Sequence, residues 1–336
     1  MSDHRLKEAE YIGCEEQLMT CFEGMLTDGP SAGVKFIQVE NGGGLSARIL
    51  PGRGLDLYQV RFAGQNMNYL SPAGARSARL YDGREDHFLR NFYVGQLTTG
   101  GLQNLGPERR VYGEMQGLHG RFDNTEASGV FCRRFVTEDG RAGLEVGGTI
   151  REGRIFGENL KTERLYRFTE GTDTITLTDT VTNEGFLPRQ FALLYHINFG
   201  YPLLEEGTHL TLDSEEVKPR TDEAAKYLNT WNAIEAPSAP YPERCYFHRL
   251  RRDADGMCEY QLYNEKRKIG AAVRFSGEAL PYFCEWKMLG KGEYVLGLEP
   301  SNTFMDGPAP GEEGCGAPVL QPGESRTYMV EFRYFR

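Results

Sequence analysis

The sequence predicts an all-β protein with only short helices. Its 41 Gly and 16 Pro are spread over all 336 residues and separate short segments in which apolar and polar residues alternate. This arrangement is typical of strands joined by short turns. Aromatic residues make up 12% of the chain, and they favour strands. No composition break, low-complexity segment or repeat divides the chain, so we expect one domain over residues 1–336, with an ambiguous pattern in residues 1–30.

The individual strands are predicted from alternating segments that end at turn residues. The most legible hairpin joins residues 164–168 to residues 174–182 through the turn Glu170-Gly171-Thr172-Asp173. Threonines at every second position of the returning strand give it one polar and one mostly apolar face. The best helix candidate is residues 221–228, with Thr221 as N-cap. The other expected strands are residues 34–39, 45–50, 55–60, 193–199, 257–263, 269–275, 282–288, 294–298 and 328–334.

Composition limits the partners and the location. The formal net charge of −10 and the pI near 5.3 argue against a nucleic-acid or anionic-membrane partner and are compatible with a small neutral ligand. No run approaches the roughly 20 apolar residues of a membrane-spanning helix, and no apolar stretch follows the polar first residues, so we expect a cytoplasmic protein. The seven cysteines lack metal-ligand spacing and are expected to be reduced: Cys14, Cys21, Cys132, Cys245, Cys258, Cys284 and Cys315.

The segment Leu193–Pro202 predicts a buried strand that carries polar chemistry on one face. Side chains on a strand alternate between its two faces, so His196 and Asn198 lie together with Leu194, while Tyr195, Ile197 and Phe199 face the other way. Burying two hydrogen-bonding groups costs free energy unless each finds a partner. The pattern therefore indicates a polar network or a bound ligand on this face.

Two further titratable residues stand in unusual local sequences. His119 lies between small neighbours that let other groups approach its ring, although a satisfied core histidine is the commoner role. Glu299 ends an otherwise apolar strand, with Gly297 leaving space on the same face and Pro300 expected to stop the strand. Partial burial would raise the pKa of this carboxyl toward the range of a general base. The alternative is a charge at the rim of the fold.

Arg53 and Trp286 could each bind a ligand, and each has a structural alternative. Arg53 lies in the tight loop Pro51–Gly54 and could donate several hydrogen bonds to ligand hydroxyls or stabilise the loop. Trp286 could offer a flat face to a sugar ring, although a core position is the commoner role of a tryptophan.

Neutral amide side chains supply donors and acceptors of the kind that hydroxyl-rich ligands require. Asn198 is one, and Gln103 and Asn104 lie in the glycine-rich, almost uncharged segment 96–106. That segment either brings backbone and amide groups to a ligand or marks positions where strands pack closely. The residues alone do not decide between these readings.

Several of these residues stand in short motifs that together resemble one family. The order and spacing of the two histidines and the glutamate resemble the DUF4432 branch of the galactose mutarotase-like (aldose 1-epimerase) superfamily, over roughly residues 34–335. The motifs that carry the resemblance are Arg53-Gly54-Leu55-Asp56, Leu118-His119-Gly120-Arg121, Leu194–Leu204 and Gly297-Leu298-Glu299-Pro300-Ser301-Asn302.

The resemblance implies a β-supersandwich with a concave sugar-binding face. In aldose 1-epimerases a glutamate acts as general base on the anomeric hydroxyl and a histidine as general acid on the ring oxygen. By motif position, Glu299 is the expected base, His196 the expected acid, and His119 and Arg53 the expected sugar-binding residues. The chain differs from better-known members in the residues after His196, and no counterpart of their sugar-binding aspartate is evident.

These expectations describe a cofactor-independent enzyme that interconverts the anomers of a sugar, as a monomer or homodimer. Ring opening needs a proton removed from O1 and one delivered to O5, which a histidine and a carboxylate can do without a metal. Two alternatives remain at this stage. One is a noncatalytic carbohydrate-binding protein with the same fold. The other is a metal-dependent sugar isomerase that uses His119, His196 and Glu299 as ligands.

Overall fold

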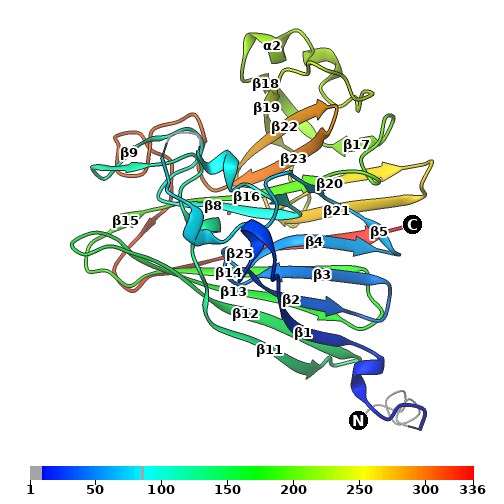
Figure 1. Ribbon diagram of the computed structural model, residues 1–336. Coiled ribbons are helices and arrows are strands. Elements are labelled where there is room, and N and C mark those ends of the chain that lie inside the picture. The colour runs from blue at the N-terminus through cyan, green and yellow to red at the C-terminus, as the bar shows by residue number, and fades with distance from the viewer. Residues whose placement is uncertain (1–9, 85–86) are drawn as a thin grey trace.

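The computed structural model describes residues 10–84 and 87–336, and three large antiparallel sheets account for most of its strands (Figure 1). Buried apolar residues from all three sheets form one cluster. The five-stranded sheet, in blue, lies over the first strands of the eight-stranded sheet, in green (Figure 1). The prediction of an all-β fold of large antiparallel sheets is confirmed. No helix among the described residues has the length and apolarity needed to cross a bilayer.

The three large sheets are built as follows. The five-stranded sheet consists of β1 (Thr20–Met25), β2 (Lys35–Glu40), β3 (Leu45–Leu50), β4 (Asp56–Phe62) and β5 (Gln65–Asn66) in that order. The eight-stranded sheet has the order β11 (Ser128–Val136), β12 (Ala142–Gly153), β13 (Asn159–Thr169), β14 (Thr174–Asn183), β25 (Ser325–Phe335), β21 (Ile269–Ser276), β20 (Met257–Asn264) and β17 (His209–Leu212). The six-stranded sheet has the order β18 (Ser214–Pro219), β19 (Arg244–Leu250), β22 (Tyr282–Gly290), β23 (Glu293–Ser301), β16 (Ala192–Phe199) and β8 (Leu97–Leu102).

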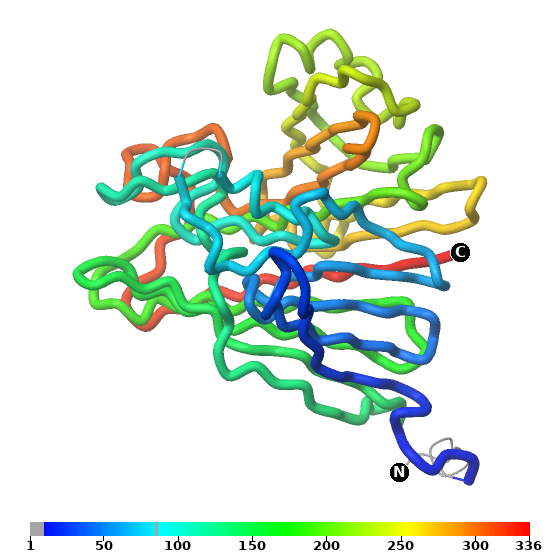
Figure 2. Tube along the Cα trace, viewed as in Figure 1, coloured from blue at the N-terminus to red at the C-terminus, as the bar shows by residue number. Residues whose placement is uncertain are grey.

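Smaller elements connect and cover these sheets. The two-stranded pairs are β6 (Tyr69–Leu70) with β7 (Val94–Gly95), β9 (Arg109–Val111) with β10 (Glu114–Gln116), and β15 (Arg189–Gln190) with β24 (Val319–Leu320). The helices are α2 (Asp222–Ala225) and the 3-10 turns η1 (Glu15–Gln17), η2 (Gly29–Ser31), η3 (Ala78–Leu80), η4 (His87–Arg90), η5 (Phe122–Asn124) and η6 (Leu228–Thr230). Figure 2 traces the segment between β18 and β19, which projects beyond the sheets at one end of the molecule.

Every predicted strand overlaps an observed one, although most of the strand ends differ by one or more residues. The helix predicted over residues 221–228 is shorter, because α2 ends at Ala225; the hydroxyl of Thr221 accepts from the Ala224 N–H as expected of an N-cap. Pro300 does not end its strand. β23 continues to Ser301, with Pro300 paired to Phe283 of β22.

The cysteine prediction is wrong for one pair. Cys21 of β1 and Cys132 of β11 form a disulfide between the five-stranded and eight-stranded sheets. They are 111 residues apart in sequence, so their proximity depends on how the two sheets stack. The other five cysteines are free.

A buried ion network ties the layers together beneath the six-stranded sheet. Arg164 of β13 donates to both carboxylate oxygens of Asp179 of β14 and, through Nη1, to Asp56 of β4 at 2.5 Å. Asp56 also accepts from the backbone N–H and the hydroxyl of Thr99 in β8. All of these side chains are buried. Because removing a charge from water is costly, each of these charged groups needs its opposite charges and hydrogen bonds within the protein. The network fixes β8, which borders β16, against the opposite layer.

Candidate functional site

His196 and Glu299 face one another on two adjacent strands of the six-stranded sheet. The register pairs Leu194 with Ser301 and Ile197 with Leu298, which places Glu299 of β23 directly across from His196 of β16. The imidazole Nε2 lies 3.2 Å from the carboxylate Oε1. We call these two residues the His–Glu pair. Cross-strand neighbours on one face of a sheet come this close without any distortion, so the pair follows from strand register alone.

Burial sets the protonation of the His–Glu pair. Glu299 is 1% exposed and His196 is 5% exposed. Loss of hydration raises the pKa of Glu299 to about 8, and the Glu243 carboxylate adds to this rise while Arg220 opposes it. Loss of hydration lowers the pKa of His196 to about 4, against the effect of its hydrogen bond to Asn198. Near neutral pH the pair therefore holds one proton, on the carboxyl group.

Gly297 provides the space in which the Glu299 carboxylate lies. A methyl group at this position would stand 2.7 Å from Glu299 Oε1, 3.0 Å from Trp286 Cε3 and 3.1 Å from His196 Cε1. These separations are shorter than van der Waals contact, so a side chain at residue 297 would displace the carboxylate. The prediction from sequence that this glycine leaves room beside Glu299 is confirmed.

Asn198 does not face a ligand. Its amide is fully buried, and its Nδ2 donates to the backbone carbonyls of Val94 and His196. Its Oδ1 lies 2.6 Å from His196 Nδ1. Both ends of the amide are thus used within the protein, and the expectation that Asn198 binds substrate is wrong. The predicted sharing of one face by His196 and Asn198 is correct.

His119 lies beside the pair, on the loop between β10 and η5. Its ring centroid is 5.7 Å from that of His196, and it is partly exposed. The Gly106 N–H donates to His119 Nδ1 at 3.4 Å, which leaves the proton of the neutral ring on Nε2. Loss of hydration, followed by the nearby His196 and Arg220, lowers the pKa of His119 to about 3. His119 is therefore a neutral hydrogen-bond donor.

The glycine-rich segment 96–106 serves close packing around the His119 loop. A methyl group on Gly101 would stand 2.2 Å from the carbonyl oxygen of Ala192, and Gly101 also exchanges backbone hydrogen bonds with the loop that carries His119. The Asn104 amide donates to the Gly117 carbonyl at 2.8 Å and holds the same loop. Of the two interpretations of this segment, the structure favours packing.

Aromatic rings surround the His–Glu pair. The Trp286 ring centroid lies 5.3 Å from that of His196, and Phe92 lies at the same distance on another side. Phe88 stands 5.6 Å from His119. Trp286 is partly exposed and lies next to the titratable residues. Ring faces of this kind pack well against the C–H faces of sugars.

Two charged residues of this site were not found from sequence. Glu243 accepts a hydrogen bond from the Trp286 indole N–H at 3.0 Å. Arg220 donates from Nε and Nη2 to both oxygens of Asp306, and it lies close enough to act on the pKa of both Glu299 and His119. Both come from the projecting segment between β18 and β19, at its two ends and outside the helix predicted in it (Figure 2).

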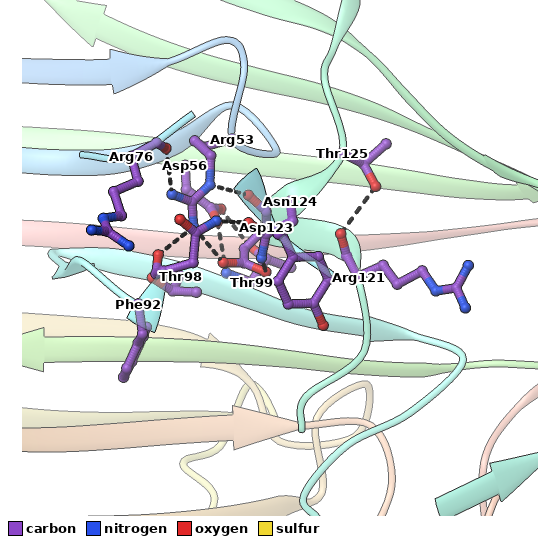
Figure 3. Close-up of polar contacts among 12 residues, drawn as sticks. Arg53, Asp56, Arg76, Phe92, Thr98, Thr99, Arg121, Asp123, Asn124 and Thr125 are labelled. Atoms are coloured by element: carbon purple, nitrogen blue, oxygen red, sulfur yellow. Dashed lines mark hydrogen bonds and ion pairs between the residues drawn. The ribbon is translucent and has the colours of Figure 1, made fainter. Parts of the chain in front are cut away.

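Arg53 and Gln103 are not positioned to bind the same ligand. The Arg53 guanidinium is 0% exposed and donates to three backbone carbonyls and to the carboxylate of Asp123 at 2.8 Å (Figure 3). The expectation that Arg53 holds a sugar is wrong, because its donors already bind protein oxygens. Gln103 is 2% exposed, and its Oε1 accepts from Arg189. Asn104 is likewise buried and bonded within the protein.

Among the described residues, no three or more His, Cys, Asp and Glu side chains are grouped so that they could hold a metal ion. His119, His196 and Glu299 are therefore not arranged as a ligand set. Nothing in the site favours the metal-dependent alternative.

Comparison of the structure with known ones identifies the fold as that of galactose mutarotase-like proteins. A candidate aldose 1-epimerase from Klebsiella pneumoniae superimposes with a TM-score of 0.87 at 22% identity, covering 96% of this chain and 86% of that chain. A galactose mutarotase-like protein from Clostridium acetobutylicum gives 0.66 at 15% identity, with 95% and 99% covered. Galactose 1-epimerase from Lactobacillus acidophilus gives 0.56 at 12% identity, with 94% and 98% covered.

The family of this chain is identified by a family model that matches most of its sequence. Residues 31–334 match the family described as "Domain of unknown function (DUF4432)", and the chain belongs to this family. None of the curated proteins matches the chain in sequence. The resemblance stated from the sequence motifs is thereby confirmed.

Proposed function

We propose that this protein is a cofactor-independent aldose 1-epimerase, which interconverts the two anomers of a small sugar. The observation that carries the proposal is the 3.2 Å approach of His196 Nε2 to Glu299 Oε1 on the face of the sheet lined by Trp286 and Phe92. Ring opening of a hemiacetal needs a general base and a general acid close together, which this pair can supply. The fold shared with galactose mutarotase-like proteins supports the proposal.

The proton balance of the reaction matches the one proton held by the His–Glu pair. Ring opening takes the proton from the anomeric hydroxyl O1, forms the C1=O1 double bond, breaks the C1–O5 bond and delivers a proton to O5. In the proposed assignment the Glu299 carboxylate accepts the O1 proton and the His196 imidazolium donates to O5. This state forms when the resting proton moves from the Glu299 carboxyl to His196 Nε2; the two atoms lie 3.2 Å apart without a hydrogen bond in the structure, so the carboxyl has to turn toward the ring for the transfer. Rotation about C1–C2 then exposes the other face of the aldehyde. Ring closure reverses the two proton transfers, so that His196 again carries the proton and Glu299 is again a carboxylate.

Substrate binding is assigned to the polar groups around the pair. The Nε2–H of His119 would donate to a sugar oxygen, and the Glu243 carboxylate would accept from hydroxyl groups while the Trp286 indole N–H holds it in place. Trp286 would also offer its ring to the sugar. Glu243 thus takes the part of the sugar-binding aspartate that the sequence motifs leave unassigned.

Anomer exchange measured on a panel of aldoses tests the proposal. Polarimetry after dissolution of a pure anomer, or NMR exchange at equilibrium, gives the rate above the spontaneous reaction. Each proton transfer contributes on the order of 10²–10⁴ in rate, so Glu299→Gln and His196→Asn should each lose most of the acceleration. Wild-type protein that is no faster than both variants on every sugar would overturn the proposal. Binding without acceleration would instead support a noncatalytic carbohydrate-binding protein.

A further inference from the structure

The orientation of the Asn198 amide is determined by its neighbours. The backbone carbonyls of Val94 and His196 can only accept hydrogen bonds, so the group that faces them must be the Nδ2 amino group, at 3.2 and 2.8 Å. The amide oxygen then faces His196 Nδ1 at 2.6 Å. Because this oxygen can only accept, the hydrogen between the two atoms belongs to Nδ1.

We propose that Asn198 is a positioning residue that keeps the neutral His196 in its Nδ1–H tautomer and so directs the proton-accepting Nε2 toward Glu299. This inference rests on the proposed function for its catalytic consequence, but the tautomer itself is a property of the free protein. Nε2 is the nitrogen that lies 3.2 Å from Glu299 Oε1. With the other tautomer, Nε2 would already carry a hydrogen and could not take the carboxyl proton.

The backbone that holds Asn198 is itself in a rarely occupied conformation. Val94 has φ of +71°, which a β-branched residue adopts only when its surroundings impose it. Its carbonyl accepts from Asn198 Nδ2 and also from the Thr98 hydroxyl at 2.8 Å. The first residue of β7 therefore presents an acceptor to the amide at a cost in backbone energy. Such a cost at a site next to titratable residues indicates a functional constraint.

The two histidines of the site are held in opposite tautomers. His119 Nδ1 accepts from a backbone N–H, which leaves the hydrogen on Nε2, whereas His196 Nδ1 donates to Asn198. His119 can therefore only donate a hydrogen bond from Nε2, and neutral His196 can only accept there. This difference fits His119 to a substrate-binding role and His196 to a proton-transfer role.

The tautomer can be measured directly by long-range ¹H–¹⁵N correlation on protein labelled with ¹⁵N-histidine, near pH 7. The His196 signals are assigned by their loss in His196→Asn. The expected spectrum has a pyrrole-type Nδ1 and a pyridine-type Nε2. In Asn198→Leu the acceptor at Nδ1 is gone, while Glu299 Oε1 remains beside Nε2, so the hydrogen is expected to move to Nε2. A pyridine-type Nδ1 in the wild-type protein, or an unchanged tautomer in Asn198→Leu, would overturn the inference.

A matched control is available for the loss of buried hydrogen bonds. Asn183 is 1% exposed, donates from Nδ2 to the carbonyls of Leu187 and Leu320, and accepts from the Gly185 N–H, but it lies at the end of β14. Asn183→Leu should lower thermal stability about as much as Asn198→Leu and leave the His196 tautomer unchanged. A tautomer change in this control as well would show that loosening of the fold, and not the Asn198 oxygen, is responsible.

Activity adds a second readout. Asn198→Leu is expected to reduce kcat about 10- to 100-fold with KM nearly unchanged, as for other partners that orient a functional histidine. Asn198→Asp keeps an acceptor at Nδ1, so it should retain the Nδ1–H tautomer and move the acidic limit of the pH profile upward, because a carboxylate stabilises the imidazolium. If the wild-type protein accelerates no sugar but shows the Nδ1–H tautomer, the proposed function fails and the role of Asn198 in fixing the tautomer stands.

Discussion

Replacing Gly297 with alanine should impair catalysis and leave the fold intact. The added methyl group would stand 2.7 Å from Glu299 Oε1, and ordinary contact begins at 3.4 Å, so the carboxylate must move by the difference of 0.7 Å. The carboxylate is the end of a flexible side chain and can move, whereas the Trp286 and His196 rings need to shift by only a few tenths of an ångström. A misplacement of about 1 Å costs on the order of 10²-fold in rate, so we expect kcat to fall about 10- to 100-fold.

The assay is anomer exchange by NMR, combined with urea denaturation of the same preparations. Gly290→Ala in β22 is the matched control, because its methyl group would meet Glu293 at 3.5 Å and Met288 at 3.7 Å, both ordinary contacts. Alanine is favoured over glycine within a strand by roughly 0.5–1 kcal/mol, so both variants should unfold within about 1 kcal/mol of the wild type. Unchanged kcat in Gly297→Ala, with normal activity in the wild type, would refute the idea that this space positions the carboxylate.

Three other predictions follow from charges and cross-links. The pair holds one proton between pH about 4 and about 8, so kcat/KM should form a plateau over this range. It should fall below pH about 4, where the base is protonated, and above pH about 8, where the acid has lost its proton. Glu299→Gln should abolish the fall at alkaline pH. Arg53→Met should lower the free energy of unfolding by about 3–5 kcal/mol in urea, because it leaves Asp123 buried and unpaired; wild-type stability would contradict this account. Thiol titration of the denatured, unreduced protein should find five cysteines, and Cys132→Ser should reduce stability by on the order of 4 kcal/mol, since the disulfide closes a long loop.

Strand alternation predicted which side chains share a face at the centre of the candidate site. The pattern of β16 placed His196 and Asn198 on one face, and the small residue at position 297 pointed to the space beside Glu299. These signals are local, because a strand has a period of two residues and each side chain's face follows from its position. That His196 and Glu299 act together was expected only from the resemblance to a family. The pairing of their two strands was not predicted, because register between strands far apart in the sequence has no local signal.

Other residues could not be assigned because their environment is tertiary. The loop sequence around Arg53 does not indicate what the guanidinium binds. In the structure it binds backbone carbonyls of residues far along the chain instead of a ligand. Glu243 and Arg220 lie on irregular segments, where no periodicity indicates a direction. The strands β11 and β12 were missed for a related reason: β11 is a largely exposed edge strand, and glycines at positions 143, 147 and 148 interrupt the pattern of β12.

Sharing one proton suits the His–Glu pair to the proposed reaction, anomer interconversion, which must run in both directions. Anomers interconvert through one open-chain aldehyde, and the ring recloses by the reverse of the transfers that opened it. A catalyst whose acid and base exchanged protons with water between steps would need the open form to wait for that exchange. With Nε2 and Oε1 3.2 Å apart in a buried site, and Asn198 holding the tautomer that lets Nε2 receive the proton, the pair can reset itself internally. The burial that raises the pKa of Glu299 and lowers that of His196 therefore keeps the proton within the pair across neutral pH.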